Sequence, residues 1–124
     1  MANDIGVVKL LISLGANVNH GKNETTPLHY AACFQRGQHH QIMQILINNG
    51  AEVDAQSGTS LTTPLHSNIW NNGSIKSAKI LLENGASLHI RNQENNTSFE
   101  YALIKDKTKL DLIRVIMNHN HNDM

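Results

Sequence analysis

A Gly-Ala pair recurs in this chain at a fixed interval. Gly15, Gly50 and Gly85 are each followed by alanine, and each lies 35 residues from the next. An apolar segment with helical spacing precedes every pair, as in LLISLGA, ILINNGA and LLENGA. The residue just past a helix end often takes the left-handed conformation, which costs glycine almost nothing. A period in the mid-thirties, with a helix before every glycine, predicts an array of stacked repeats.

A second motif predicts where another helix of each unit begins. The pentapeptide TTPLH occurs twice and NTSFE replaces it in the third unit, at residues 25–29, 62–66 and 96–100. Thr26 and Thr63 are suited to cap a helix whose first position is proline. In the third unit, Thr97 and Glu100 have the spacing of a capping box. The segments before these caps are polar and turn-prone, so each unit is predicted to be a loop, a short helix, a turn and a longer helix.

These motifs resemble those of ankyrin-repeat proteins. The resemblance rests on TPLHYAA at 26–32, on TPLH at 63–66, and on the helix endings that lead into GANVN, GAEVD and GASLH. It covers nearly the whole chain and implies an all-α solenoid of stacked antiparallel helix pairs with projecting hairpin-like loops. The single domain 1–124 would divide into a partial first repeat, two complete repeats and a C-terminal capping repeat, at 1–20, 21–55, 56–91 and 92–124.

The first and last helices of the array are expected to differ from the internal ones. The chain starts inside the second helix of a repeat, so the apolar face of residues 5–14 would lack the helix that normally precedes it. Either the protein is a piece of a longer array, or a partner or self-association covers that face. Residues 108–117 are expected to form the last outer helix. Its apolar side would contain Leu110, Ile113 and Ile116, and its water-facing side would contain Lys109, Asp111 and Arg114.

Two internal features depart from the family pattern. The segment FQRGQHHQ lengthens the connection after the first short helix. Asn68 and Ile69 stand where the family has two alanines that allow close helix packing. A local distortion of the middle unit is therefore expected.

Composition and charge exclude several classes of partner. Ten basic and ten acidic residues balance, and neither half of the chain concentrates one sign, so nucleic acid is not expected to bind. The longest apolar run, residues 10–12, is far shorter than the ~20 residues of a membrane span, and no signal-peptide pattern is present. The single cysteine, Cys33, cannot form an internal disulfide, which fits an intracellular location in cytoplasm or nucleus, or in host cytoplasm if the protein is an effector.

No residue pattern indicates catalysis, or binding of a metal or cofactor. The resemblance implies that His29 and His66 hold loop backbone by hydrogen bonds, a structural role. The His39-His40 and His119-Asn120-His121 groups lack zinc spacing with cysteine or carboxylate support. Cys33 has no nucleophile elbow or oxyanion loop around it. The chain is therefore expected not to be an enzyme.

The resemblance also implies a concave face, formed by the loops and the first helix of each pair, where a partner protein binds. Variable positions at the end of that helix are Cys33, Phe34, Trp70, Asn71, Ile104 and Lys105. Trp70 is the only tryptophan, and beside Phe34 it would anchor a partner. The alternative is that both rings fill space left by the long connections. Loop residues of mixed charge would form a polar rim, and they include His20, Lys22, Asn23, Glu24, Gln56, Ser57, Thr59, Arg91, Gln93 and Glu94.

Two functions are left open by these patterns. The first is a non-catalytic protein-protein interaction module that uses the concave face. The second is a regulatory or targeting segment of a larger enzyme, channel, or pathogen or viral effector that acts on host proteins. Asn19, Asp54 and His89 occupy loop positions at which similar proteins are hydroxylated, so this modification is also left open.

Overall fold

The computed structural model describes the chain from residue 4 to residue 118, with gaps. The described residues are 4–21, 24–33, 39–71, 74–105, 112, 114, 115, 117 and 118. They form six helices, which are α1 (Asp4–Ser13), α2 (Pro27–Ala32), α3 (His39–Asn48), α4 (Pro64–Trp70), α5 (Ile75–Glu83) and α6 (Ser98–Lys105).

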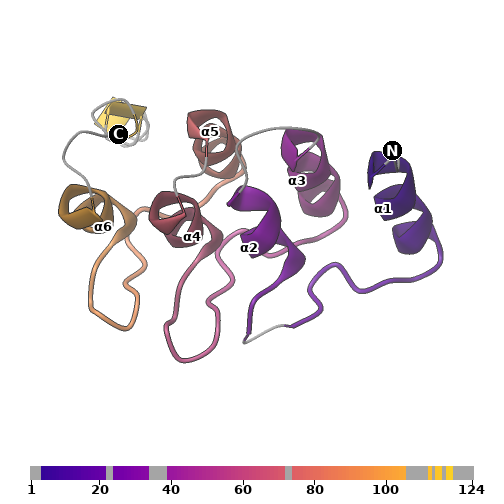
Figure 1. Cartoon of the computed structure of the whole chain (residues 1–124), viewed down its shortest axis with the longest axis horizontal. Helices are drawn as coiled ribbons and strands as arrows, with labels where there is room; N and C mark the ends of the chain where they lie inside the picture. Colours follow the sequence, from indigo (N-terminus) through magenta and orange to yellow (C-terminus); the bar gives the residue numbers. More distant parts are fainter. Residues whose placement is uncertain are drawn as a thin grey trace.

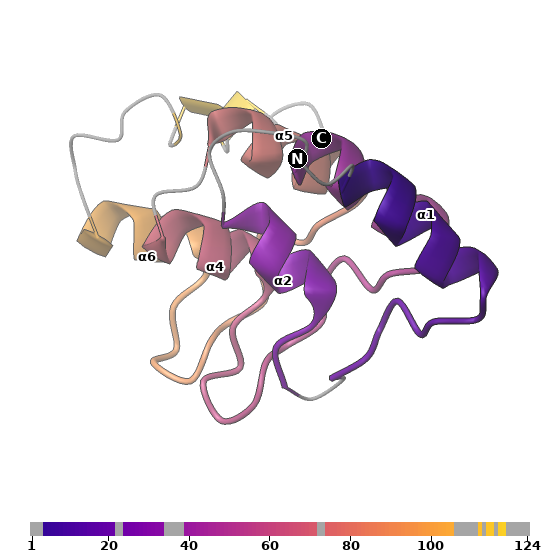
Figure 2. The ribbon, with the colours of Figure 1, turned by 45° about the vertical axis from the view of Figure 1, so that its right-hand side comes forward.

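The helices stand in two rows (Figure 1). The inner row contains α2, α4 and α6, and the outer row contains α1, α3 and α5. Each inner helix packs against its neighbour in the row, and α2 and α4 also pack against the outer helices that follow them, α3 and α5. The loops before α4 and α6 project to the same side of the inner row (Figure 2). The expected all-helical stack of helix pairs with projecting loops is confirmed.

The inner helices begin at side-chain caps. Thr63 Oγ1 accepts the N–H of His66 at 3.2 Å, while the Thr63 N–H donates to His66 Nδ1 at 3.4 Å. In the third unit the Thr97 N–H donates to Glu100 Oε1 at 3.0 Å, and Thr97 Oγ1 accepts the Glu100 N–H at 3.2 Å. Each cap satisfies backbone donors that a helix start leaves without an intrahelical partner.

The outer helices all end in the same way. Gly15, Gly50 and Gly85 have φ angles of 94°, 96° and 92°. The N–H of the alanine after each glycine donates to a carbonyl five residues earlier, at 3.0 Å in all three units. This is the hydrogen bond of a Schellman-type ending, which needs a left-handed residue at the glycine position.

The core lies between the two rows. It contains buried alanine, leucine, isoleucine and methionine side chains, among them Ala32, Met43, Leu65, Ile69, Ala78, Leu81 and Ala102, each of them at most 1% exposed. Small side chains at the crossing points let the short helices approach closely.

The helix α4 runs unbroken through Asn68 and Ile69, so the unusual pair does not interrupt it. The buried Asn68 Nδ2 donates to the carbonyl oxygens of Ala32, at 2.9 Å, and Ser74, at 3.2 Å. The amide therefore connects α4 to the end of α2 and to the residue that caps α5.

The two ends of the array differ. On α1, Val7, Leu10 and Leu11 are exposed, and Leu14, just after the helix, is 73% exposed. Of the expected last outer helix, residues 112, 114, 115 and 117 are described and helical, and residue 118 just beyond its expected end is helical too. Leu112 is buried there, whereas Leu110, Ile113, Ile116, Lys109 and Asp111 lie outside the described residues. None of the described helices has the length and hydropathy to cross a membrane.

Candidate functional site

Histidines at the start of the inner helices connect each unit to the next. His29 Nε2 lies 2.7 Å from the carbonyl oxygen of Thr62, and His66 Nε2 lies 2.9 Å from that of Asn96. A carbonyl oxygen only accepts, so Nε2 carries the proton. On the other side of the ring, His29 Nδ1 accepts the N–H of Thr26 at 3.1 Å. Each ring is therefore held as one neutral tautomer between a cap and the next loop.

The surroundings of both rings favour the neutral form. Burial lowers the pKa of His29 and of His66 from the ordinary value of 6.5, and the hydrogen bonds to backbone carbonyls oppose this only in part. A second proton would sit on Nδ1, which faces backbone N–H donors. These histidines are built to position the loops.

A second set of polar residues connects the units on the outer side of the loops. Asn19 Nδ2 donates to the carbonyl oxygen of Gly50 at 3.0 Å, and Asn19 Oδ1 accepts the N–H of Glu52 at 2.8 Å. One unit later, Asp54 Oδ1 accepts the N–H of Ser87 at 2.9 Å. The sequence interpretation gave Asn19 and Asp54 no such role, although their equivalent positions before successive caps were a signal for it.

A groove of about 330 Å³ lies between α4, α6 and the loops that precede them. We call it the inner groove. Its lining residues are Ser57, Ser60, Thr62, Ser67, Trp70, Asn71, Asn92, Gln93, Glu94 and Tyr101. The groove lies where the family resemblance places the concave face, and its wall combines hydroxyl, amide and aromatic groups.

The aromatic part of the inner groove comes from two successive units. The rings of Trp70 and Tyr101 are stacked, with centroids 5.8 Å apart and planes at 26°. Tyr101 also meets the edge of His66, at 5.6 Å between centroids. Trp70 remains 54% exposed. The sequence interpretation missed Tyr101, although this residue has the position of Tyr30 in the TTPLHY motif.

The loops that flank the inner groove are tied to each other. The Gln93 N–H donates to the carbonyl oxygen of Ser60 at 2.8 Å, and Gln56 Nε2 donates to that of Arg91 at 3.2 Å. Within one loop, Ser57 and Thr62 form an antiparallel bridge. The predicted hairpin-like loop is therefore present, and its neighbour is hydrogen-bonded to it.

Comparison with known proteins identifies the repeat. A family model described as ankyrin repeats, in three copies, matches residues 1–92. The chain belongs to the ankyrin-repeat family. Ankyrin repeats are generally protein-protein interaction modules, and they are generally non-catalytic.

Similar ankyrin proteins occur in viruses and animals. One from fowlpox virus is 32% identical over 120 residues, which are 94% of this chain and 34% of that protein. One from Acanthamoeba polyphaga mimivirus is 30% identical over 117 residues, 94% of this chain and 14% of that protein. The human ankyrin repeat and KH domain-containing protein 1 is 33% identical over 92 residues, 73% of this chain and 4% of that protein. The chain thus spans about a third or less of the length of these relatives.

The other expected contact residues of the ankyrin array lie in different surroundings. Cys33 is half-buried and its Sγ lies 3.1 Å from the carbonyl oxygen of His29. Burial raises the pKa of this thiol, and a hydrogen bond from Asn71 opposes the rise. Ile104 is 68% exposed and Glu24 is exposed. Phe34, Lys22 and the side chain of Lys105 lie outside the described residues.

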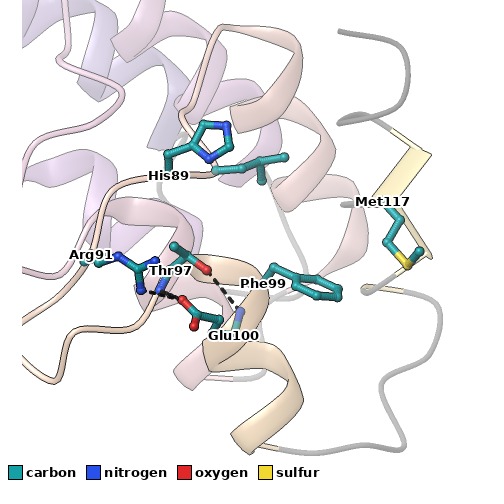
Figure 3. A pocket seen from close by; sticks show the side chains of 7 residues that line it. His89, Arg91, Thr97, Phe99, Glu100 and Met117 are labelled. Atoms are coloured by element: carbon teal, nitrogen blue, oxygen red, sulfur yellow. Dashed lines mark hydrogen bonds and ion pairs between the residues drawn. The ribbon is translucent and has the colours of Figure 1, made fainter. Parts of the chain in front are cut away.

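Arg91 does not line the inner groove. Its Nη1 lies 2.7 Å from Glu100 Oε1 and donates to the carbonyl oxygen of Asn95 at 2.8 Å. The backbone N–H and hydroxyl of Thr97 lower the pKa of Glu100, and Arg91 adds to this effect. This ion pair belongs to a second pocket, of about 380 Å³, where Phe99 points toward the segment that carries Met117 (Figure 3).

A third hollow, of about 410 Å³, lies beside α2 at the N-terminal end of the array. Its lining residues are Val8, His20, Thr25, Pro27, Tyr30, Ala31, His39, Ile42 and Leu46. The helix α1 supplies Val8 to this hollow and also carries the exposed Val7, Leu10 and Leu11.

Among the described residues, no group of three or more His, Cys, Asp or Glu side chains could hold a metal ion. His40 Nε2 instead lies 2.7 Å from Ser74 Oγ. The histidines near the C-terminus, His119 and His121, lie outside the described residues.

Proposed function

We propose that this ankyrin array is a non-catalytic module that binds another protein through the inner groove. The observation that carries the proposal is the Trp70–Tyr101 stack, which places a half-exposed indole in a groove walled by hydrogen-bonding side chains. Tryptophan and tyrosine are enriched among the residues that dominate binding energy at protein interfaces.

The rigidity of the groove supports the same function. The histidine bonds and the Gln93–Ser60 bond fix the two loops relative to the inner helices before any partner arrives. A preformed surface loses less conformational entropy on association, which favours binding.

The test compares two exposed aromatic side chains on different surfaces of the same chain. The intact protein, Trp70→Ala and Tyr30→Ala are used to capture proteins from lysate, after circular dichroism has shown that all three fold. Tyr30 is 61% exposed on α2, beside the N-terminal hollow, so its variant is a matched control. A partner kept by Tyr30→Ala and lost by Trp70→Ala supports the inner groove. The reverse pattern, or no partner at all, argues against it.

A second candidate is that the array acts as the targeting segment of a larger protein, such as a viral effector that acts on host proteins. Two of the similar proteins are viral, and both are much longer than this chain. Sequencing the complete transcript tests this candidate, because a coding sequence confined to these 124 residues would contradict it. Either candidate is proposed to work inside a cell, as the unpaired Cys33 suggests.

A further inference from the structure

We propose that the inner groove receives an arginine side chain of the partner polypeptide, with its guanidinium stacked on Trp70 and paired with Glu94. The inference rests on the proposed function and adds the chemistry that the partner must present.

The charge of the groove is the first argument. Glu94 supplies the only formal charge among the described lining residues. The nearest cation on the same loop, Arg91, is held by Glu100. Within the described part of the chain no cation pairs with the Glu94 carboxylate. The groove is therefore complementary to a positive group and repels an acidic one.

The position of the carboxylate relative to the rings is the second argument. Burial raises the pKa of the Tyr101 hydroxyl, and the negative charge of Glu94 raises it further. Glu94 and Tyr101 also line the same groove, so the carboxylate lies on the side of the groove that holds the tyrosine hydroxyl. A cation that pairs with Glu94 inside the groove would share it with Trp70 and Tyr101, and an aromatic face attracts a cation through the ring quadrupole.

The hydrogen bonds of Asn71 provide the third argument. Its Nδ2 donates to the carbonyl oxygen of Ser67 at 2.9 Å and to Cys33 Sγ at 3.3 Å. Both amide hydrogens are thus used within the protein, and Oδ1 is the group that Asn71 can offer to a ligand. A carboxylate, an amide oxygen and two aromatic rings line one groove, and this combination requires a ligand that donates hydrogen bonds and stacks.

Arginine fits this combination better than lysine. Its guanidinium carries five N–H donors in a planar fork, so it can pair with Glu94, donate to Asn71 and lie flat on Trp70 at the same time. An ammonium group is compact and strongly hydrated, so it could not make all of these contacts at the same time.

Trp70 is the only tryptophan, so its indole N–H signal in an NMR spectrum reports on the groove directly. The probes are the tripeptide Ac-Gly-Arg-Gly-NH2, its lysine analogue, and a neutral analogue that contains citrulline, which has nearly the same shape as arginine. We expect a saturable shift with the arginine probe, with an affinity about fivefold higher than that of the citrulline probe. The lysine probe should bind more weakly than the arginine probe.

The charge requirement is tested with exposed variants that leave the core unchanged. Glu94→Gln should lower the affinity for the arginine probe about fivefold and leave the citrulline probe unchanged. Glu94→Lys should abolish arginine binding. Glu83→Gln removes the same charge from an exposed site on α5, outside the groove, and should have no effect.

Several outcomes would overturn the inference. They are equal affinity for arginine and citrulline, equal affinity for arginine and lysine, no shift with arginine, or no effect of Glu94→Gln. If any of these occurs while protein capture is still lost with Trp70→Ala, the groove binds a partner by other chemistry, and the proposed function stands without this inference. If capture does not depend on Trp70, the proposed function itself fails.

Discussion

The Nε2 atom of His66 donates a hydrogen bond to the carbonyl oxygen of Asn96, 30 residues further along the chain, at 2.9 Å. The same ring accepts the Thr63 N–H through Nδ1, so a single neutral imidazole joins a helix cap to the loop of the next unit. His29 repeats the arrangement one unit earlier. The spacing between the loops, and with it the width of the inner groove, depends on these two uncharged rings.

Acid should therefore destabilise the array. Burial lowers the folded-state pKa of His29 and His66 below the ordinary 6.5, so between these values the unfolded chain binds more protons than the folded chain. The contribution of the neutral rings is complete above about pH 6.5 and is lost as the pH falls through the folded-state pKa. Urea unfolding at pH 7.5, 6.5 and 5.5 should show a falling free energy of unfolding.

The variant His66→Gln separates this effect from other titrations. It should be less stable than the intact chain at pH 7.5 and should lose less stability between pH 7.5 and 5.5. Glu100 has a lowered pKa too, but carboxylates titrate at lower pH and leave this window unaffected. Stability that is constant, or that rises, from pH 7.5 to 5.5 would contradict the assignment of neutral histidines.

Gly50→Ala should destabilise the protein through its backbone alone. A methyl group added at Gly50 meets no atom within 4 Å, but its φ of 96° is unfavourable for alanine. A cost of about 1 kcal/mol in the free energy of unfolding is expected, measured by urea titration. Asn48→Ala, on the exposed end of the same helix, is the control and should change stability little. An unchanged or higher stability of Gly50→Ala would show that the Schellman-type ending contributes nothing.

Asn68→Asp should strongly lower the free energy of unfolding, although the two side chains have nearly the same size. The buried Nδ2 donates to two carbonyl oxygens, and an aspartate would place an acceptor, and a charge, against both. We expect a loss of about 3 kcal/mol or more in the free energy of unfolding at pH 7. Asn17→Asp is the matched control, because Asn17 is exposed and, among the described residues, its side chain bonds through its oxygen alone, to the Asn19 N–H. Equal stability of the two variants would contradict the proposed role of Asn68.

The sequence predicted those features of the fold that depend on neighbouring residues. The caps at Thr63 and Thr97 and the glycines after the outer helices are local signals, and the helix starts and ends were found from them. Contacts between units were harder to foresee. The Trp70–Tyr101 stack depends on how two helices in successive units are aligned, and no pattern within one unit contains that information.

At Asn68 the sequence predicted a distortion that the structure does not have. Compared with the alanine of the family pattern, an asparagine in a helix crossing suggested distortion. The structure instead places the end of α2 and the start of α5 where their carbonyls accept its hydrogens. A polar residue in a core is tolerated when its partners lie at the right distance, and those partners come from segments distant in sequence.

Amide exchange should distinguish the two ends of the array from its middle. In the described part of the chain, α1 packs on α3, and its leucines at positions 10 and 11 are exposed, so little burial opposes its opening. Exchange is expected to be fastest in α1 and slowest around residues 42–47 and 78–82, because α3 packs on α1, α2 and α5, and α5 packs on α3 and α4. The experiment is repeated at several protein concentrations. Protection of α1 that extends to Ile5 and grows with concentration would show that a second copy covers this apolar surface. Protection at all concentrations would contradict the prediction, because it would mean that α1 is stabilised within a single chain.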